Sequence, residues 1–152
     1  MSATGRNVTG FVAASATLVP IILLIVTRLV WTSAPSKVPS HFEGEGTADA
    51  FSSSSQIFIG CLLLTAVVVV AAFAIAFLGG DLDPSKRGFA LGATNLVSAV
   101  TGLTWIVLSL SEVNANNGGS ANIGSPFLLF LCAIDWGLVG FLITFPFRRS
   151  TP

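Results

Sequence analysis

Four long apolar stretches constrain this chain more than any other feature of its sequence. They run without the alternation of a half-buried strand, and each approaches or exceeds the roughly 20 residues that a helix needs to cross a bilayer. In lipid every backbone amide must be paired within the spanning segment, which favours helix. The stretches cover residues 10–31, 56–79, 89–110 and 127–145. We expect an all-α polytopic membrane protein, a four-transmembrane-helix bundle that forms one membrane domain over residues 1–152.

The composition supports lipid as the solvent of this chain. Charged residues make up 9% and hydrophobic residues 53% of the sequence, whereas about 25% of an average soluble domain is charged. The formal net charge of zero argues against a nucleic-acid partner, which demands a basic surface. Cys61 and Cys132 lie inside apolar runs. We expect them to act as small hydrophobes, with a bridge between the second and fourth spans as the alternative.

The basic residues predict the orientation of the spans. Positive charge in short loops favours the cytoplasmic side. Five basic residues lie at the two chain ends and in the second connection: Arg6, Lys86, Arg87, Arg148 and Arg149. The first and third connections hold only Lys37. This asymmetry predicts an N-in/C-in topology, with the first connection, residues 32–55, outside the cytoplasm.

The first connection contains a dense set of conformationally restricted residues. Pro35 and Pro39 each fix their own φ and bias the preceding residue to an extended geometry. Gly44 and Gly46 permit a tight turn after them. We therefore expect a segment that folds back over the outer end of the bundle.

The same segment carries a recognisable spacing of residue types. It reads Pro-x-x-Val-Pro-x-His-Phe-x-x-x-Gly-x-x-Asp from Pro35 to Asp49. This pattern, directly after a first membrane helix, resembles the N-terminal domain of unknown function in the SdpI-type bacterial membrane immunity protein family. The resemblance covers about a third of the chain, and it implies a multi-span protein of the bacterial cytoplasmic membrane. Members of that family protect a producer cell against a secreted toxin and relay a signal, and this chain departs from the full-length type in having four expected spans.

Within the motif, five residues are candidates for binding a partner or ligand outside the membrane. They are His41, Phe42, Glu43, Gly46 and Asp49. A second interpretation is a structural lid, in which His41 and Asp49 hydrogen-bond the turn and Phe42 packs it onto the helix ends. A third is a divalent-cation site formed with Glu45, because imidazole and carboxylate groups bind such ions. The spacing matches no defined metal loop, so we expect no metal and no cofactor.

Polar residues inside the spans are the second group of candidates: Arg28, Asn95 and Asp135. An ionised carboxylate at membrane depth is costly and normally faces the bundle interior with a partner. We expect Asp135 to do so. Arg28 is its candidate partner, because the two residues differ in depth by about 7.5 Å at 1.5 Å rise per residue and their side chains lean toward each other. The alternatives are that Arg28 extends to the outer headgroups and that Asp135 is protonated or bonds a polar neighbour.

Small and polar residues predict how the helices pack. In the third span they recur at steps of three or four: Asn95, Ser98, Gly102, Trp105 and Ser109. Ser98 with Gly102, and Ala133 with Gly137 in the fourth span, have the spacing that allows close helix approach. Packing is the expected purpose, and a polar pathway is the alternative. Pro20 frees a carbonyl in the first span and predicts a kink there.

Recognised catalytic patterns are missing from the sequence. There is one histidine, no nucleophile motif with a nearby base and no phosphate-binding glycine loop. We expect a non-enzymatic accessory or immunity-like protein of the lipid bilayer, which recognises another membrane protein or a secreted peptide through its outer loop. The alternatives are a small transporter or channel subunit that uses Arg28, Asn95 and Asp135, and a structural subunit of a larger complex. A homo-oligomer is compatible with each.

Overall fold

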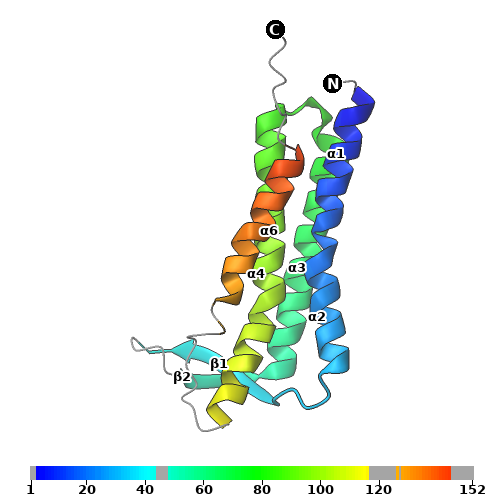
Figure 1. The fold of residues 1–152 in the computed structure, drawn as a ribbon. Coiled ribbons are helices and arrows are strands. Elements are labelled where there is room, and N and C mark those ends of the chain that lie inside the picture. The colour runs from blue at the N-terminus through cyan, green and yellow to red at the C-terminus, as the bar shows by residue number, and fades with distance from the viewer. Residues whose placement is uncertain (1–2, 44–47, 117–125, 127, 145–152) are drawn as a thin grey trace.

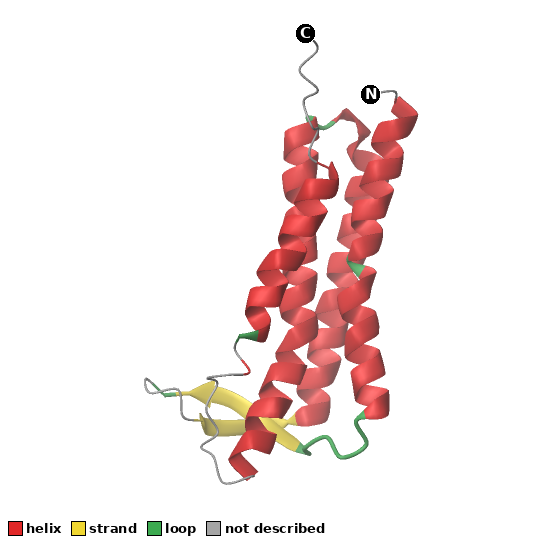
Figure 2. Ribbon diagram, in the orientation of Figure 1, coloured by secondary structure: helices red, strands yellow, loops and turns green. Residues whose placement is uncertain are grey.

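The computed structural model is an elongated helical bundle with a small β-hairpin at one end (Figures 1 and 2). It describes all residues except 1–2, 44–47, 117–125, 127 and 145–152. The elements are α1 (Ala3–Ala16), α2 (Leu18–Val30), β1 (Lys37–Phe42), β2 (Ala48–Ser53), α3 (Ser54–Leu78), the 3-10 helix η1 (Gly79–Asp81), α4 (Pro84–Asn116) and α6 (Leu129–Thr144). The start of α1, the α3–α4 connection and the end of α6 lie at the end opposite the hairpin.

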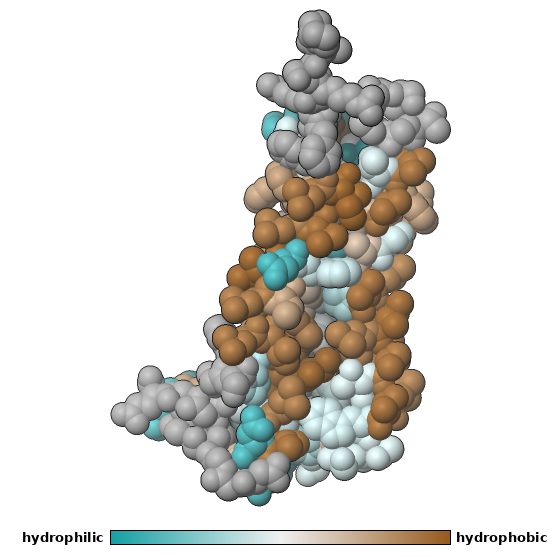
Figure 3. All heavy atoms as spheres, viewed as in Figure 1, coloured by the Kyte–Doolittle hydropathy of each residue, from teal (hydrophilic) through white to brown (hydrophobic). Residues whose placement is uncertain are grey.

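Three helical segments in the described part of the chain are long and apolar enough to cross a membrane: Val8–Val30, Ser54–Asp81 and Pro84–Asn116. Large hydrophobic side chains lie exposed along these helices, and they cover much of the visible side of the bundle in Figure 3. Water would disfavour such a surface, and hydrocarbon would not. These features indicate a membrane protein.

The fourth predicted span is shorter than expected. The helix α6 has 16 residues, which rise about 24 Å at 1.5 Å per residue, less than the ~30 Å of a typical hydrocarbon core. The ends of the predicted range, residues 127 and 145, lie outside the described residues. By contrast α4 extends beyond its predicted range of 89–110 at both ends. At its start the backbone N–H of Ser85 donates to Asp83 Oδ1 at 2.9 Å, which caps the first turn.

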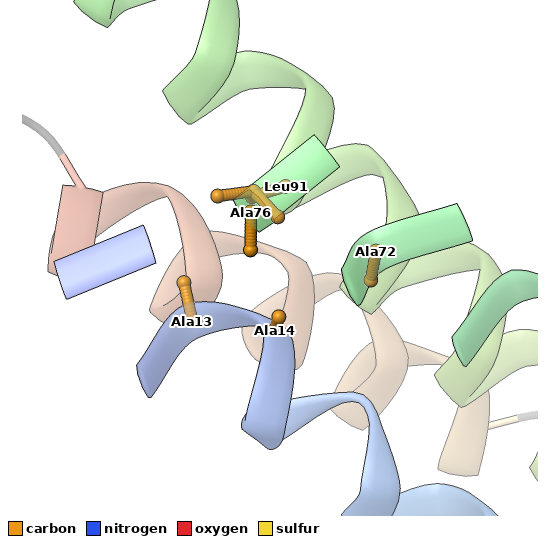
Figure 4. Packing of buried hydrophobic residues seen from close by; sticks show 5 residues of the cluster. All are labelled: Ala13, Ala14, Ala72, Ala76 and Leu91. Atoms are coloured by element: carbon orange, nitrogen blue, oxygen red, sulfur yellow. The ribbon is translucent and has the colours of Figure 1, made fainter. Parts of the chain in front are cut away.

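The central helix α4 packs against α1, α2, α3 and α6. Close approach to α6 depends on glycine. A Cβ added at Gly137 would lie 2.8 Å from the Cβ of Leu96, and one at Gly92 would lie 3.0 Å from the Cβ of Phe141. The predicted small-residue packing is confirmed: Ser98, Gly102, Ala133 and Gly137 are all buried. Alanines allow close packing of α1 on α3 as well. Ala13 and Ala14 of α1 contact Ala72 and Ala76 of α3 and Leu91 of α4 (Figure 4).

The predicted kink in the first span is present as a break between two helices. The α1 helix ends at Ala16 and α2 begins at Leu18, with Pro20 buried in the first turn of α2. Thr17 between them turns back on the preceding helix, its hydroxyl donating to the carbonyl of Ala14 at 2.6 Å. Because proline has no N–H and clashes with the carbonyl four residues before it, the break falls one turn before Pro20.

The prediction of an all-α chain is wrong in one place. Residues 37–42 and 48–53 of the expected outer loop form a two-stranded antiparallel hairpin. The fold-back itself was expected, but the extended geometry imposed around Pro35 and Pro39 continues into a ladder. Pro39 is tolerated because a two-stranded sheet consists of edge strands. Val38 and Pro39 are buried, and β1 packs against α4, so the hairpin is fixed to the bundle.

Candidate functional site

The candidate site is the face of the hairpin that carries His41 and Asp49. The ladder has the same register at both ends, from Lys37 opposite Ser53 to Phe42 opposite Ala48, and a local irregularity lies at His41. This register brings His41, near the end of β1, and Asp49, near the start of β2, onto one face. His41 Nδ1 and Asp49 Oδ1 lie 2.6 Å apart. The sequence analysis expected both residues to hydrogen-bond the turn in its lid interpretation, and the structure pairs them with each other.

The pair is accessible from outside the protein. The His41 side chain is 68% exposed and the Asp49 side chain 36% exposed. Asp49 holds Nδ1 and so orients the ring. Within the described residues Nε2 has no hydrogen-bond partner, so it can donate to or accept from an incoming group. Hydrogen bonds to a fixed imidazole and carboxylate give a binding surface for a polar or charged partner. Within the described residues no three His, Cys, Asp or Glu side chains are grouped to hold a metal ion.

The other candidates of the motif lie around this pair or outside the described residues. Phe42 is half-buried at the end of β1, and Glu43 is exposed directly after it. Gly46 belongs to residues 44–47, which are outside the described part, as is Glu45. Phe51 on β2 is 47% exposed and adds an apolar group to the hairpin.

An aromatic cluster joins the hairpin to the helices. Trp105 of α4 is fully buried, and its indole N–H donates to Ser54 Oγ at 2.9 Å. Ser54 begins α3, and its backbone N–H donates to the carbonyl of Ser36 at 3.0 Å, just before β1. Trp31 and Phe58 pack edge-on against Trp105 at centroid distances of 6.0 and 5.4 Å. The base of the hairpin is thus held on both strands.

Arg28 joins this aromatic cluster and does not pair with Asp135. Its guanidinium lies 5.9 Å from the ring centroids of both Phe58 and Trp105, a cation–π geometry. Within the described residues, the ion pair that involves a carboxylate joins Asp49 to His41. The predicted ion pair of Arg28 with Asp135 is therefore wrong. The α2 helix packs on α3 and α4, and this places the Arg28 guanidinium over the aromatic rings.

Asn95 lies at the break of the first span. Its side-chain amide donates to the carbonyl of Ala13 at 3.0 Å and to that of Leu91 at 2.8 Å. Ser98, one turn on, donates to the carbonyl of Thr17 at 2.9 Å. The Oδ1 atom of Asn95 is buried and has no partner within the described residues. The polar stripe of α4 therefore supplies side-chain donors to carbonyls on both sides of the break between α1 and α2.

Trp136 completes the same cluster, and the sequence analysis missed it. Its indole N–H donates to the carbonyl of Ala16 at 3.1 Å. Ala16 lies four residues before Pro20, so its carbonyl is the one that loses a helical donor. The freed carbonyl was predicted, but its partner could not be read from a sequence without knowing that α6 packs against α1.

Asp135 lies on the outer surface of α6, exposed, which corrects the expectation of an inward carboxylate. A signal for this was available in the sequence. At 100° per residue, Asp135 lies about 200° from Ala133 and roughly opposite the small residues that pack on α4. Cys132, one turn before, is also exposed, and Cys61 is buried; both thiols are free, so the alternative of a bridge is wrong here.

Arg87 corrects a second expectation from the sequence. The sequence predicts a loop cation at this position, but Arg87 is 7% exposed in the first turn of α4. Its guanidinium donates to the carbonyl of Ala76 near the end of α3 and lies against Gly10. A cation favours the C-terminal end of a helix, where carbonyls are unpaired. Spacing could have revealed it, because 87, 91, 95, 98 and 102 continue the buried stripe of α4.

Comparisons of the chain with protein-family models, with curated proteins and with solved structures found no match. The geometry of the residues described above is therefore the basis for assigning a function.

Proposed function

We propose that this chain is a non-enzymatic integral membrane protein with an immunity-like or accessory role, which recognises a partner outside the cytoplasm through its hairpin. The observation that carries the proposal is the exposed His41–Asp49 pair, held at 2.6 Å on a hairpin that is anchored to the bundle. An ordered, exposed polar group on a rigid scaffold is typical of binding surfaces. The resemblance to the SdpI-type family, whose motif contains both residues, supports the same role.

The proposed topology is four spans in a bacterial cytoplasmic membrane, with both chain ends inside. The basic residues at the end of the bundle opposite the hairpin support this orientation. Lys86, exposed next to the α3–α4 connection, marks that end. The partner in this arrangement is a secreted peptide or the outer domain of another membrane protein.

A thiol-labelling experiment tests the topology. In a background with Cys61→Ala and Cys132→Ala, the exposed positions Ser40 and Lys86 are each replaced by cysteine and treated with a membrane-impermeant maleimide on intact cells. Ser40→Cys is expected to react directly. Lys86→Cys is expected to react only after the membrane is permeabilised. The reverse pattern would overturn the external position of the hairpin.

A second experiment tests recognition. Cells that produce the chain are challenged with a panel of secreted bacterial peptide toxins, and a photo-reactive residue at Glu43 captures what the hairpin contacts. His41→Ala and Asp49→Ala are expected to abolish protection and capture while membrane insertion is retained. Ser40→Ala, exposed on the same strand, is the matched control and should behave as the parent. If both variants protect and crosslink as the parent does, the proposed function is wrong.

The geometry does not favour a transport function. Arg28, Asn95 and Asp135 were its proposed residues, and each has a separate environment. Arg28 lies over two aromatic rings, Asn95 bonds the carbonyls of Ala13 and Leu91, and Asp135 faces outward. A polar pathway needs such groups to line one passage, so we do not propose one.

A further inference from the structure

The outer face of α6 has a regular pattern that the hairpin function does not use. Four exposed leucines lie on this face: Leu128, directly before α6, and Leu131, Leu138 and Leu142 within it, which are 60%, 54%, 53% and 55% exposed. With Asp135 between them they follow steps of three, four, three and four residues. This is the a/d spacing of helices that pack side by side. We name these five residues the α6 stripe.

The opposite side of α6 is already occupied. Ala133, Gly137 and Gly140 are buried, and the glycines lie against Leu96 and Asn95 of α4. The helix therefore has one face of small residues that packs within the chain and one face of leucines that does not. Cys132 and Ile134, on the two flanks of the stripe, are exposed as well.

Asp135 distinguishes this face from an ordinary lipid-facing surface. It is the seventh of the 16 residues of α6, near mid-helix, and its short side chain cannot extend to the headgroups as lysine or arginine does. A carboxylate at membrane depth is expensive unless it is paired. A single polar residue at an a position also sets the register between two helices. Asp135 therefore favours a neighbouring helix that carries a group complementary to its carboxylate.

Within the described residues no cation pairs with Asp135, so we look for one in another protein. In the described part of the chain, Arg28 is held over Phe58 and Trp105, and Arg87 is buried between α1 and α3. A second copy inserted in the same orientation would place Asp135 against Asp135 in a parallel pair, which leaves negative charge in the hydrocarbon. A lysine or arginine would cancel it.

We propose that the α6 stripe is the docking surface for a membrane helix of another protein that carries one lysine or arginine at the depth of Asp135. The stripe supplies the apolar contact, and the ion pair fixes the depth and register of the partner helix. This interaction takes place within the membrane, on a surface separate from the hairpin, and it does not depend on the function proposed for His41 and Asp49.

The test uses the purified full chain in phosphatidylcholine vesicles and a synthetic helix as the probe. The probe is a helix of about 21 leucines, long enough to span, with one lysine at its centre; the control peptide has leucine there. Energy transfer between labelled chain and labelled peptide gives the affinity. We expect the lysine peptide to bind about tenfold more tightly than the leucine peptide, and Asp135→Leu to remove this difference.

Two controls separate docking from general attraction and from misfolding. In the first, Asp135→Leu is combined with Val67→Asp, which moves the carboxylate to an exposed site on α3, where Val67 is 66% exposed; this variant is expected not to regain tight binding. In the second, Asp135→Asn, nearly equal in shape, must keep the melting temperature of the parent while it loses most of the preference for lysine.

Three results would overturn the proposal. The first is equal binding of the two peptides by the parent chain. The second is equal affinity for the lysine peptide when the carboxylate lies on α3. The third is energy transfer between two labelled copies of the chain that requires Asp135 and excludes the lysine peptide, which would show that a second copy occupies the stripe.

Discussion

The inner face of α4 and the outer face of α6 both place polar side chains along an apolar helix, and the two faces satisfy them differently. Asn95 and Ser98 donate to carbonyls of the interrupted first span, at 3.0 and 2.9 Å. Asp135 faces away from the bundle and has no ion pair within the described residues. The polar groups of α4 are thus part of how this chain holds itself together, whereas that of α6 is available to something else.

The largest expected effect concerns the packing that separates these two faces. Gly137→Leu puts a side chain where a Cβ alone would lie 2.8 Å from Leu96, so α6 must move away from α4. Overpacking typically costs 1–3 kcal/mol, and we expect about 3 kcal/mol or loss of folding, measured by unfolding in mixed detergent. Gly60→Leu is the matched control, because nothing lies within 4 Å of its Cβ position. Equal losses in both variants would contradict the close α4–α6 contact.

The next prediction compares the two faces directly through their polar residues. Asn95→Leu leaves the carbonyl of Ala13 without its side-chain donor, and we expect unfolding to become easier by about 1–2 kcal/mol. Asp135→Leu removes an exposed carboxylate, and we expect unchanged or greater stability of the isolated chain and membrane insertion that is more favourable by about 3 kcal/mol. Detergent unfolding and an insertion assay measure the two quantities. If Asp135→Leu lowers stability as much as Asn95→Leu, the two faces do not differ in how their polar residues contribute to folding.

Much of the bundle follows from residue type, and the parts that differ have physical reasons. Apolar length located the helices near residues 10–31, 56–79 and 89–110, because hydrocarbon thickness sets that length. The ends of α4 were missed because both carry polar residues outside the apolar run. Its first turn is capped by Asp83, and α4 packs against β1 at the hairpin end of the bundle. The strands of the hairpin were missed because Pro39, which lies opposite Phe51, is a poor strand residue.

The candidate site was predictable in part for a similar reason. His41 and Asp49 are eight residues apart, and a fold-back between them sufficed to bring the two side chains together. Arg28 and Asp135 lie in different helices, and their pairing required knowledge of which helices are neighbours. Depth along the membrane normal can be counted from a sequence, whereas the direction of a side chain around its helix depends on packing. Arg28 consequently lies among aromatic rings.

A third prediction concerns the anchoring of the hairpin. Trp105→Phe retains an aromatic ring but removes the N–H that donates to Ser54 Oγ at 2.9 Å. We expect a loss of about 1 kcal/mol, expressed locally as faster amide hydrogen exchange in residues 37–42 and 48–53. Thr104→Val is the control on the same helix, because the Thr104 hydroxyl bonds only its own helix, at the carbonyl of Val100. Unchanged exchange in the hairpin would show that Val38 and Pro39 hold it alone.

The smallest expected effect is a coupling between the proline of the first span and the tryptophan of α6. Trp136→Phe removes the donor to the carbonyl of Ala16, at an expected cost of about 0.6 kcal/mol, as for other hydrogen bonds between membrane helices. In a Pro20→Ala background a backbone N–H returns at residue 20 and can bond that carbonyl, so the same tryptophan change should cost almost nothing. Detergent unfolding of the parent, both single variants and the double variant gives the coupling energy. Additive losses would mean that Trp136 stabilises the bundle by packing, and that the carbonyl released by Pro20 does not depend on α6.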